Sequence, residues 1–373
     1  MHTLSFTGAR QVRFPAPDVA RGFMLALIAL ANVPFWIAYF PETPRAGHAA
    51  LAAMGSADQW WYLARTLFVD RRAYPLFSIL FGFGMAIMAS RTIERERRFA
   101  LDALPPELSA GWNPVQWEIF RDRVERRAHR AAARLIRRRG WWMLAFGLLH
   151  GIVFSGDIIG AYGLVAVIFA EVIVMRRAWA RILAGSLIAT LSLMGITMGG
   201  AMMGREPMVL EYHGPMSLNA WYPLVSFGSW LVATPATVLT ALVVPCVMIG
   251  VGVARWGFLQ DPRGRGALLA GIAFGGLAFG ALGGAPFALM QLDWAFSNSA
   301  AWSYPLFHAS GVAGACGWLA LLALVGGGPR EKLGTVCAFL SAIGRRSMTA
   351  YLSQTLLFIL IFSVLGACGV RSL

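Results

Sequence analysis

A histidine and an aspartate lie seven residues apart, on either side of a short turn. His150 ends one apolar stretch and Asp157 begins the next, and Gly156 between them permits a tight turn. A carboxylate beside an imidazole orients the ring and raises its basicity, which is the usual preparation of a general base. We therefore predict that His150 and Asp157 are the catalytic residues. In the simpler alternative, Asp157 caps its helix and His150 is an interfacial polar residue.

A second polar group lies at the start of the first apolar stretch. Asp18 and Arg21 are three residues apart, so they share one face of a helix and lie within ion-pair reach. Asn32 lies near the middle of the same stretch, where an amide is costly unless it hydrogen-bonds to another helix. All three are candidates for substrate binding. A helix cap followed by a snorkelling arginine is the alternative for Asp18 and Arg21.

A third polar group begins the last apolar stretch. Arg345 precedes this stretch, and helical spacing places Ser347, Tyr351 and Gln354 on one face and Thr349 on another. Such side chains either line a polar cavity or join neighbouring helices by hydrogen bonds. We predict that Arg345, Thr349, Tyr351 and Gln354 contribute to substrate binding.

The composition places these groups in a membrane protein. Hydrophobic residues make up 58% of the 373 residues and charged residues only 13%, and a soluble chain of this size could not bury so much apolar surface. The predicted membrane spans are 19–39, 74–90, 140–154, 157–175, 182–203, 231–254, 266–288, 300–326 and 347–368. We predict an all-α polytopic transmembrane bundle of nine or ten spans, forming a single integral membrane domain over residues 1–373.

The arginines orient this bundle. Thirteen of them lie in the segment 91–139, and the other basic turns fall on the same side when nine spans alternate. The positive-inside rule makes that side cytoplasmic, together with the N-terminus. The loops 40–73 and 204–230 then face outward, and His150 and Asp157 lie at the outer interface of the cell membrane.

The basic segment has a helical pattern of its own. Trp117, Phe120, Val124, Ala131 and Leu135 recur at steps of three, four or seven, and arginines occupy the opposite face. This pattern predicts an amphipathic helix on the membrane interface, with its cations toward anionic lipid headgroups. The alternative is a binding site for a phosphorylated ligand such as coenzyme A.

Several other classes of function are not indicated. The net charge of +14 does not predict nucleic-acid binding, because the basic residues are distributed between apolar windows as in membrane proteins. The four cysteines form neither a CxxC spacing nor a Cys/His cluster, so neither a disulfide framework nor a metal site is expected. The first apolar stretch, Val19 to Tyr39, is too long for a cleavable signal peptide and is expected to remain as a membrane helix.

Four motifs, in this order, resemble the bacterial YeiB-like membrane proteins, a family of unknown function. They are Asp18-Val19-Ala20-Arg21-Gly22 with Asn32; Phe77 through Gly84; Gly147-Leu148-Leu149-His150 with Gly156-Asp157-Ile158; and Gly344-Arg345 with Thr349, Tyr351 and Gln354. A departure is Ala350, where the family tends to carry asparagine. The family is in turn similar to transmembrane acyltransferases, including those that N-acetylate heparan glucosamine. These pass an acyl group from cytosolic acyl-CoA to an acceptor across the membrane.

The resemblance implies a bacterial inner-membrane acyltransferase that uses acyl-CoA as a co-substrate and binds no cofactor tightly. His150, supported by Asp157, would act as general base on a hydroxyl or amine acceptor, which is a small molecule or a lipid. Arg21, Arg345 and the basic cytoplasmic segment 91–139 would attract the phosphates of the donor. The side chains that would line the path between donor and base are Thr349, Tyr351 and Gln354.

Two other classes of function use the same polar groups. In a small-molecule transporter, His150 and Asp157 would be a protonatable pair on the substrate pathway. In a non-catalytic membrane scaffold, the polar residues would only hold the bundle together.

Overall fold

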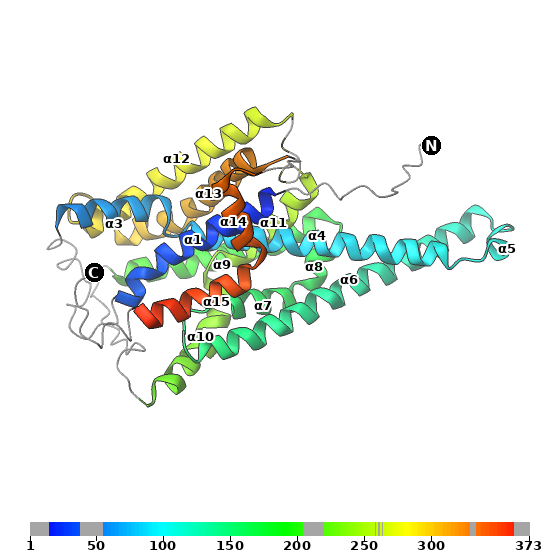
Figure 1. Cartoon of the computed structure of the whole chain (residues 1–373), viewed down its shortest axis with the longest axis horizontal. Helices are drawn as coiled ribbons and strands as arrows, with labels where there is room; N and C mark the ends of the chain where they lie inside the picture. The colour runs from blue at the N-terminus through cyan, green and yellow to red at the C-terminus, as the bar shows by residue number, and fades with distance from the viewer. Residues whose placement is uncertain are drawn as a thin grey trace.

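The computed structural model describes residues 15–37, 55–203, 220–257, 259, 262, 264–328 and 333–361, which are 85% helical and contain no strand. The helices are α1 (Ala16–Ile37), α3 (Ser56–Phe68), α4 (Ala73–Asp102), α5 (Pro106–Ser109), α6 (Pro114–Gly151), α7 (Ile159–Ile168), α8 (Ala170–Val174), α9 (Ala178–Met203), α10 (Tyr222–Thr240), α11 (Val243–Trp256), α12 (Gly266–Gln291), α13 (Ala300–Gly326), α14 (Thr335–Arg345) and α15 (Ser347–Phe358). The predicted all-α polytopic bundle is confirmed (Figure 1).

Six helical stretches are each long and apolar enough to cross a membrane. They are Ala16–Val33, Ser56–Asp102, Ala178–Met202, Tyr222–Thr240, Gly266–Gln291 and Ala300–Gly326. Shorter apolar helices, among them α7, α11, α14 and α15, pack between these stretches. The predicted spans fall on helix over most of their described residues, except at the turn 152–158, at Phe169 and Met175, and at the break 241–242. The ends of the first and last spans lie outside the described residues. The predicted outer loops were too long, because 40–73 contains α3 and the last residues of 204–230 begin α10.

The basic segment 91–139 is the paired ends of two long helices rather than a loop. α4 has 30 residues and α6 has 38, which correspond to lengths of about 45 and 57 Å. Both exceed the ~30 Å of a membrane hydrocarbon core. Their ends, residues 91–102 and 114–139, project together from the bundle and are joined through α5 (Figure 1). We call this projection the stalk.

The part of α6 that belongs to the stalk packs its apolar face on α4. Ala128, Ala132 and Ile136 are fully buried in a cluster that includes Ile93 of α4. The predicted stripe is half-buried on this side: Trp117, Phe120, Val124, Ala131 and Leu135. The amphipathic pattern was therefore predicted correctly, but its partner is a second helix rather than the membrane surface. A neighbouring helix can cover an apolar face as a membrane surface would.

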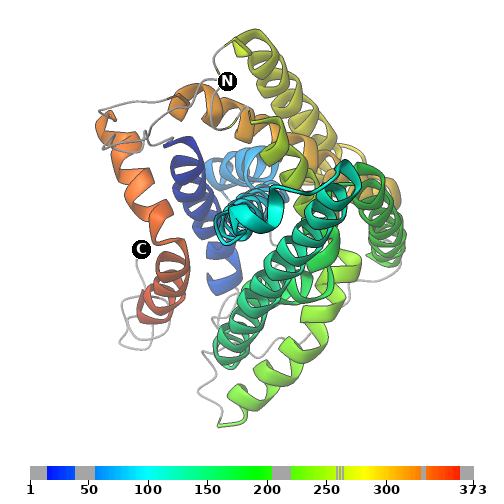
Figure 2. The same ribbon diagram turned by 90° about the vertical axis from the view of Figure 1, so that its right-hand side faces the viewer.

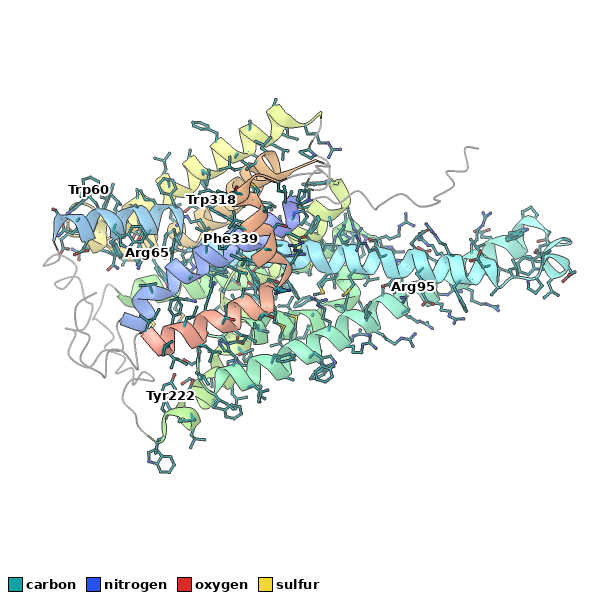
Figure 3. The ribbon with its side chains drawn as sticks, in the orientation of Figure 1. Trp60, Arg65, Arg95, Tyr222, Trp318 and Phe339 are labelled. Carbon is teal, nitrogen blue, oxygen red and sulfur yellow. The ribbon has the colours of Figure 1, made fainter. Side chains whose placement is uncertain are left out.

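Exposed tryptophans lie at two levels of the bundle. Trp141 and Trp142 follow the arginines 137–139 of α6, and Trp179 and Trp256 lie at the corresponding ends of α9 and α11. The other exposed tryptophans are Trp60, Trp61, Trp221, Trp294 and Trp302. Figure 3 shows Trp60 at the end of the molecule opposite Arg95. Because tryptophan is enriched at membrane interfaces, the region between the two levels is the membrane-embedded part, and we call the end with the stalk the arginine-rich face.

The C-terminal end of α6 and the helix α7 form a hairpin around the turn 152–158. From Trp142, α6 continues for nine residues to Gly151, about 14 Å along its axis. α7 has ten residues and α8 follows it directly after Phe169, so residues 159–174 correspond to about 24 Å. That this turn reaches the outer interface of the membrane stays a prediction.

α10 covers the far side of this turn. The Tyr222 hydroxyl donates to the carbonyl of Val153 at 2.8 Å, and the Ser226 hydroxyl donates to that of Gly151 at 2.7 Å. Irregular backbone inside a membrane requires such partners, because lipid supplies none. These contacts give two backbone carbonyls at the turn their hydrogen-bond partners.

α1 packs against α14 and α15 at one side of the bundle (Figure 2). A Cβ atom on Gly22 would overlap the carbonyl of Leu340, and one on Gly344 would overlap the carbonyl of Asp18. Glycine at both positions thus permits the helices to touch backbone to backbone, as small residues do in membrane bundles. This contact holds the start of α1 beside Arg345.

Candidate functional site

His150 and Asp157 meet across the turn between α6 and α7. The Nδ1 atom of His150 lies 2.8 Å from Oδ1 of Asp157, and their side chains are only 6% and 0% exposed. The second carboxylate oxygen accepts hydrogen bonds from the backbone N–H of Gly160 at 2.7 Å and from Nε1 of Trp230 at 3.3 Å. Three donors on one buried carboxylate fix its position, and the carboxylate in turn fixes the imidazole ring.

Glycines allow this arrangement. A Cβ on Gly147 of α6 would lie 2.5 Å from the backbone nitrogen of Gly160, and a Cβ on Gly160 would lie 2.5 Å from Cζ2 of Trp230. Both distances are too short for any larger residue, so α6, α7 and the Trp230 indole approach one another only because these positions are glycine. The Gly147 motif noted in the sequence therefore positions Asp157.

The second ring nitrogen of His150 contacts Thr355 of α15. Nε2 lies 2.9 Å from Oγ1 of Thr355, which is itself buried. Because ionised Asp157 only accepts hydrogen bonds, Nδ1 of a neutral His150 carries the ring proton and Nε2 is the acceptor. Thr355 then donates its hydroxyl proton to Nε2. The sequence patterns did not single out Thr355, although it follows Tyr351 by four residues on the same helical face.

A cavity of about 1180 Å³ lies between α1, α4, α6 and the junction of α14 with α15. Its charged lining residues are Asp18, Arg21, Arg91, Arg95, Arg139 and Arg345. Most other lining residues are apolar or aromatic, including Phe77, Phe81, Met143 and Phe146. The cavity thus combines cations on the arginine-rich face with an apolar interior. Such a site suits a molecule with anionic groups at one end and an apolar group at the other.

Four of the seven predicted substrate-binding residues line this cavity. Asp18 and Arg21 pair at 3.3 Å, and Arg345 and Tyr351 belong to the same lining. Arg91, Arg95 and Arg139 were predicted only as members of the basic segment 91–139 and not as individual site residues, because this segment was assigned to a loop. The spacing of Arg91 and Arg95 on one face of α4 was the available signal.

The other three predicted residues are elsewhere. Thr349 is exposed on α15. The amide Nε2 of Gln354 donates to the carbonyl of Leu25 at 2.9 Å, so this side chain joins α15 to α1. Asn32 is half-buried on α1 and is not part of the cavity lining. For Gln354, the alternative role of holding helices together is the one that the structure shows.

Tyr351 connects the cavity with the buried pair. Its ring lines the cavity, is 5% exposed and packs edge-on against the ring of His150, with a centroid distance of 5.4 Å. His150 itself is not in the lining. A single aromatic side chain therefore lies between the cavity and the imidazole.

A second buried polar cluster lies apart from this site. Arg72 is 1% exposed and donates to the carbonyls of Thr66 at 2.7 Å, Asp70 at 2.6 Å and Gly280. It joins α3, α4 and α12. His308 of α13 is also buried, and its ring nitrogens have no hydrogen-bond partner within the described part of the chain.

Within the described ranges, no group of three or more His, Cys, Asp or Glu side chains is placed to hold a metal ion. Three of the cysteines, Cys246, Cys316 and Cys337, are free thiols. Cys368 lies outside the described residues.

These features define a polytopic α-helical membrane protein with a cavity and a buried polar site. Within that class, residues 253–371 match the model of a family described as a protein of unknown function, DUF418. The match agrees with the resemblance to the uncharacterised YeiB-like family. The matched residues include Arg345, Tyr351 and Thr355 but neither His150 nor Asp157. No curated protein and no solved structure matches the chain.

Proposed function

We propose that the protein is a membrane acyltransferase that moves an acyl group from acyl-CoA to a hydroxyl or amine acceptor. The observation that carries the proposal is the meeting of cavity and buried pair at Tyr351, which lines the one and contacts the other. The arginine-lined cavity, which suits an anionic amphiphile, is thereby separated from the histidine–carboxylate pair by one ring, that of Tyr351. This is the arrangement that a buried group-transfer reaction requires, because donor binding and proton transfer must occur side by side.

The cavity suits coenzyme A thioesters. The phosphate groups of the donor would bind among Arg21, Arg139 and Arg345, since guanidinium groups form strong, paired hydrogen bonds with phosphate. The pantetheine arm and the acyl group would extend along the apolar interior toward Tyr351. A volume of about 1180 Å³ exceeds that of many small-molecule pockets and leaves room for a donor of this size.

The buried pair supplies the proton chemistry. Asp157 holds His150 in the tautomer whose Nε2 accepts a proton. In the transfer, a hydroxyl or amine loses its proton to the imidazole and forms a bond to the thioester carbonyl carbon. The carbon–sulfur bond then breaks, and the thiolate leaving group takes up the proton as free thiol.

The stalk supports the predicted orientation of the chain. Its arginines and the adjoining start of α1 belong on the cytoplasmic side of the cell membrane by the positive-inside rule, which puts the N-terminus in the cytoplasm. The cavity then draws acyl-CoA from the cytoplasm.

A small-molecule transporter is the second candidate. The turn 152–158 and the break between α10 and α11 interrupt the helices of the bundle, and transporters use such breaks at substrate sites. This function predicts pH-dependent flux into proteoliposomes without any release of thiol. A non-catalytic scaffold is the remaining alternative, and it predicts neither flux nor thiol release.

The test is acyl-CoA binding and thiol release by the purified protein in lipid nanodiscs. The variants Arg21→Gln and Arg345→Gln are each expected to weaken binding of radiolabelled acetyl-CoA about tenfold, because each removes a charge-assisted hydrogen bond of about 1.5 kcal/mol. Arg130→Gln is the matched control, since Arg130 is exposed on the stalk and does not line the cavity. Equal affinities in all four proteins, or no binding by the wild type, would refute the proposal.

A further inference from the structure

We propose that Thr355 is a catalytic nucleophile that carries the acyl group as an ester between donor and acceptor. This inference rests on the proposed acyltransferase function and adds a covalent step to it. The residues involved are the chain Asp157, His150 and Thr355, which come from α7, α6 and α15.

The first support is the geometry of that chain. Oδ1 of Asp157 lies 2.8 Å from Nδ1 of His150, and Nε2 lies 2.9 Å from Oγ1 of Thr355. A hydroxyl, a histidine base and an orienting carboxylate joined in this order are the parts of an activated oxygen nucleophile. The Asp157 carboxylate is fixed independently by Gly160 and Trp230. The orienting group is therefore held whether or not a ligand is bound.

The second support is that Nε2 of His150 is already engaged. An acceptor could give its proton directly to this nitrogen only by displacing the Thr355 hydroxyl, which already contacts it. The proton nearest to the base is thus the one on Thr355. The geometry points to Thr355 Oγ1 as the atom that His150 activates.

The third support is the position of Thr355 relative to the cavity. Tyr351 and Thr355 lie one helical turn apart on the same face of α15, about 6 Å along its axis. Both are buried, and both contact His150. An acyl group that reaches Tyr351 from the cavity therefore has the Thr355 hydroxyl as its next neighbour along α15.

In the first half-reaction, Oγ1 of Thr355 forms a bond to the carbonyl carbon of an acyl thioester and its proton passes to Nε2 of His150. The carbon–sulfur bond breaks, and the sulfur leaves with that proton as a free thiol. Thr355 now holds the acyl group as an ester, and His150 is again neutral.

In the second half-reaction, an acceptor hydroxyl or amine gives its proton to Nε2 and attacks the ester carbonyl carbon. The bond from this carbon to Oγ1 breaks, and Thr355 recovers its proton from His150. The two half-reactions together transfer the acyl group and consume no other reactant.

The experiment incubates nanodisc-embedded protein with radiolabelled acetyl-CoA in the absence of acceptor and quenches it in acid. We expect a burst of thiol equal to at most one per chain, a mass increase of one acetyl group, and peptide mapping of the label to Thr355. Thr355→Val keeps the shape of the side chain but removes the nucleophile. This variant should therefore lose the label, and its burst rate should fall by at least about 100-fold. Thr355→Ser should keep both.

Ser353→Ala is the matched control, because Ser353 is on the same helix and its hydroxyl donates only to the Thr349 carbonyl one turn before it. The inference is overturned if the wild type releases thiol without an acyl group on Thr355, or if Thr355→Val keeps the wild-type burst. Those results leave the acyltransferase proposal in place. A wild type that neither binds nor cleaves acetyl-CoA overturns both. The wild-type labelling result stands even if Thr355→Val does not fold.

Discussion

Replacing Asp157 with asparagine is predicted to preserve the buried site while reversing its hydrogen bonds. An asparagine whose amide oxygen takes the place of Oδ2 still accepts from Gly160 and Trp230. Its NH₂ group then faces Nδ1 of His150, which must become an acceptor. The ring proton moves to Nε2, and Thr355 changes from donor to acceptor. His150 can then no longer take up a proton at Nε2.

The effect on stability follows from counting these bonds. In Asp157→Asn all three bonds remain, one of them reversed, but each loses the charge on residue 157, at about 1 kcal/mol each, or about 3 kcal/mol in total. In Asp157→Ala three buried N–H donors lose their acceptor, at about 1–3 kcal/mol each, or about 3–9 kcal/mol in total. A loss in the upper part of that range approaches the whole stability of a typical domain.

Two assays on the same nanodisc samples separate the effects. Thermal unfolding followed by tryptophan fluorescence should rank the wild type above Asp157→Asn, and Asp157→Asn above Asp157→Ala. Thiol release from acetyl-CoA should fall about 100- to 10,000-fold in Asp157→Asn, because the general base is lost. A wild-type rate in Asp157→Asn, or equal melting temperatures in the two variants, would refute the assignment of roles.

Two further predictions concern packing and the stalk. Gly147→Ala places a methyl group 2.5 Å from the Gly160 nitrogen and should lower the free energy of unfolding by about 1–3 kcal/mol in the same melting assay. Gly252→Ala is the control, because a methyl group there has nothing within 4 Å, and it should be neutral or slightly stabilising. In the stalk, the hydrogen bond from Arg97 lowers the pKa of Glu125 from its ordinary value of 4.5. A lowered pKa means that this ion pair stabilises the stalk above about pH 4.5 and stops doing so as the pH falls through the folded-state pKa. The rate of amide hydrogen exchange in the stalk, corrected for the intrinsic rate, should therefore be constant above about pH 5 and increase below about pH 4. Arg97→Gln should move this increase to higher pH. A pH profile that Arg97→Gln leaves unchanged would contradict the role of the pair.

The membrane-spanning character of the chain could be predicted from local sequence alone. Lipid requires long uncharged windows, so the predicted spans 266–288 and 300–326 coincide closely with α12 and α13. The stalk could not be predicted in this way. A charged stretch resembles a loop when its partner is unknown, and the bidentate contact from Arg97 to Glu125 joins residues 28 positions apart.

The packing of the turn between α6 and α7 was also beyond the local pattern. Apolar windows at 140–154 and 157–175 suggest two straight crossings, but α6 ends at Gly151 and α7 ends at Ile168, before the short helix α8. Tyr222 and Ser226 of α10 cover the turn. Such contacts are formed only in the folded bundle.

The candidate site was accessible to sequence reasoning where its members are close in the chain. His150 and Asp157 are brought together by one turn, whereas Thr355 lies 205 residues from His150 and depends on the packing of α15. Polar residues in apolar stretches were useful but not sufficient signals. Arg21 and Arg345 line the cavity, but Gln354 binds a backbone carbonyl of α1 instead.

The most direct test of the central claim is an experimental structure in lipid with a non-hydrolysable acyl-CoA analogue. We expect phosphate density among Arg21, Arg139 and Arg345, and the acyl end of the analogue against Tyr351, next to His150. A cavity filled by protein or lipid, or an analogue bound away from these arginines, would contradict it.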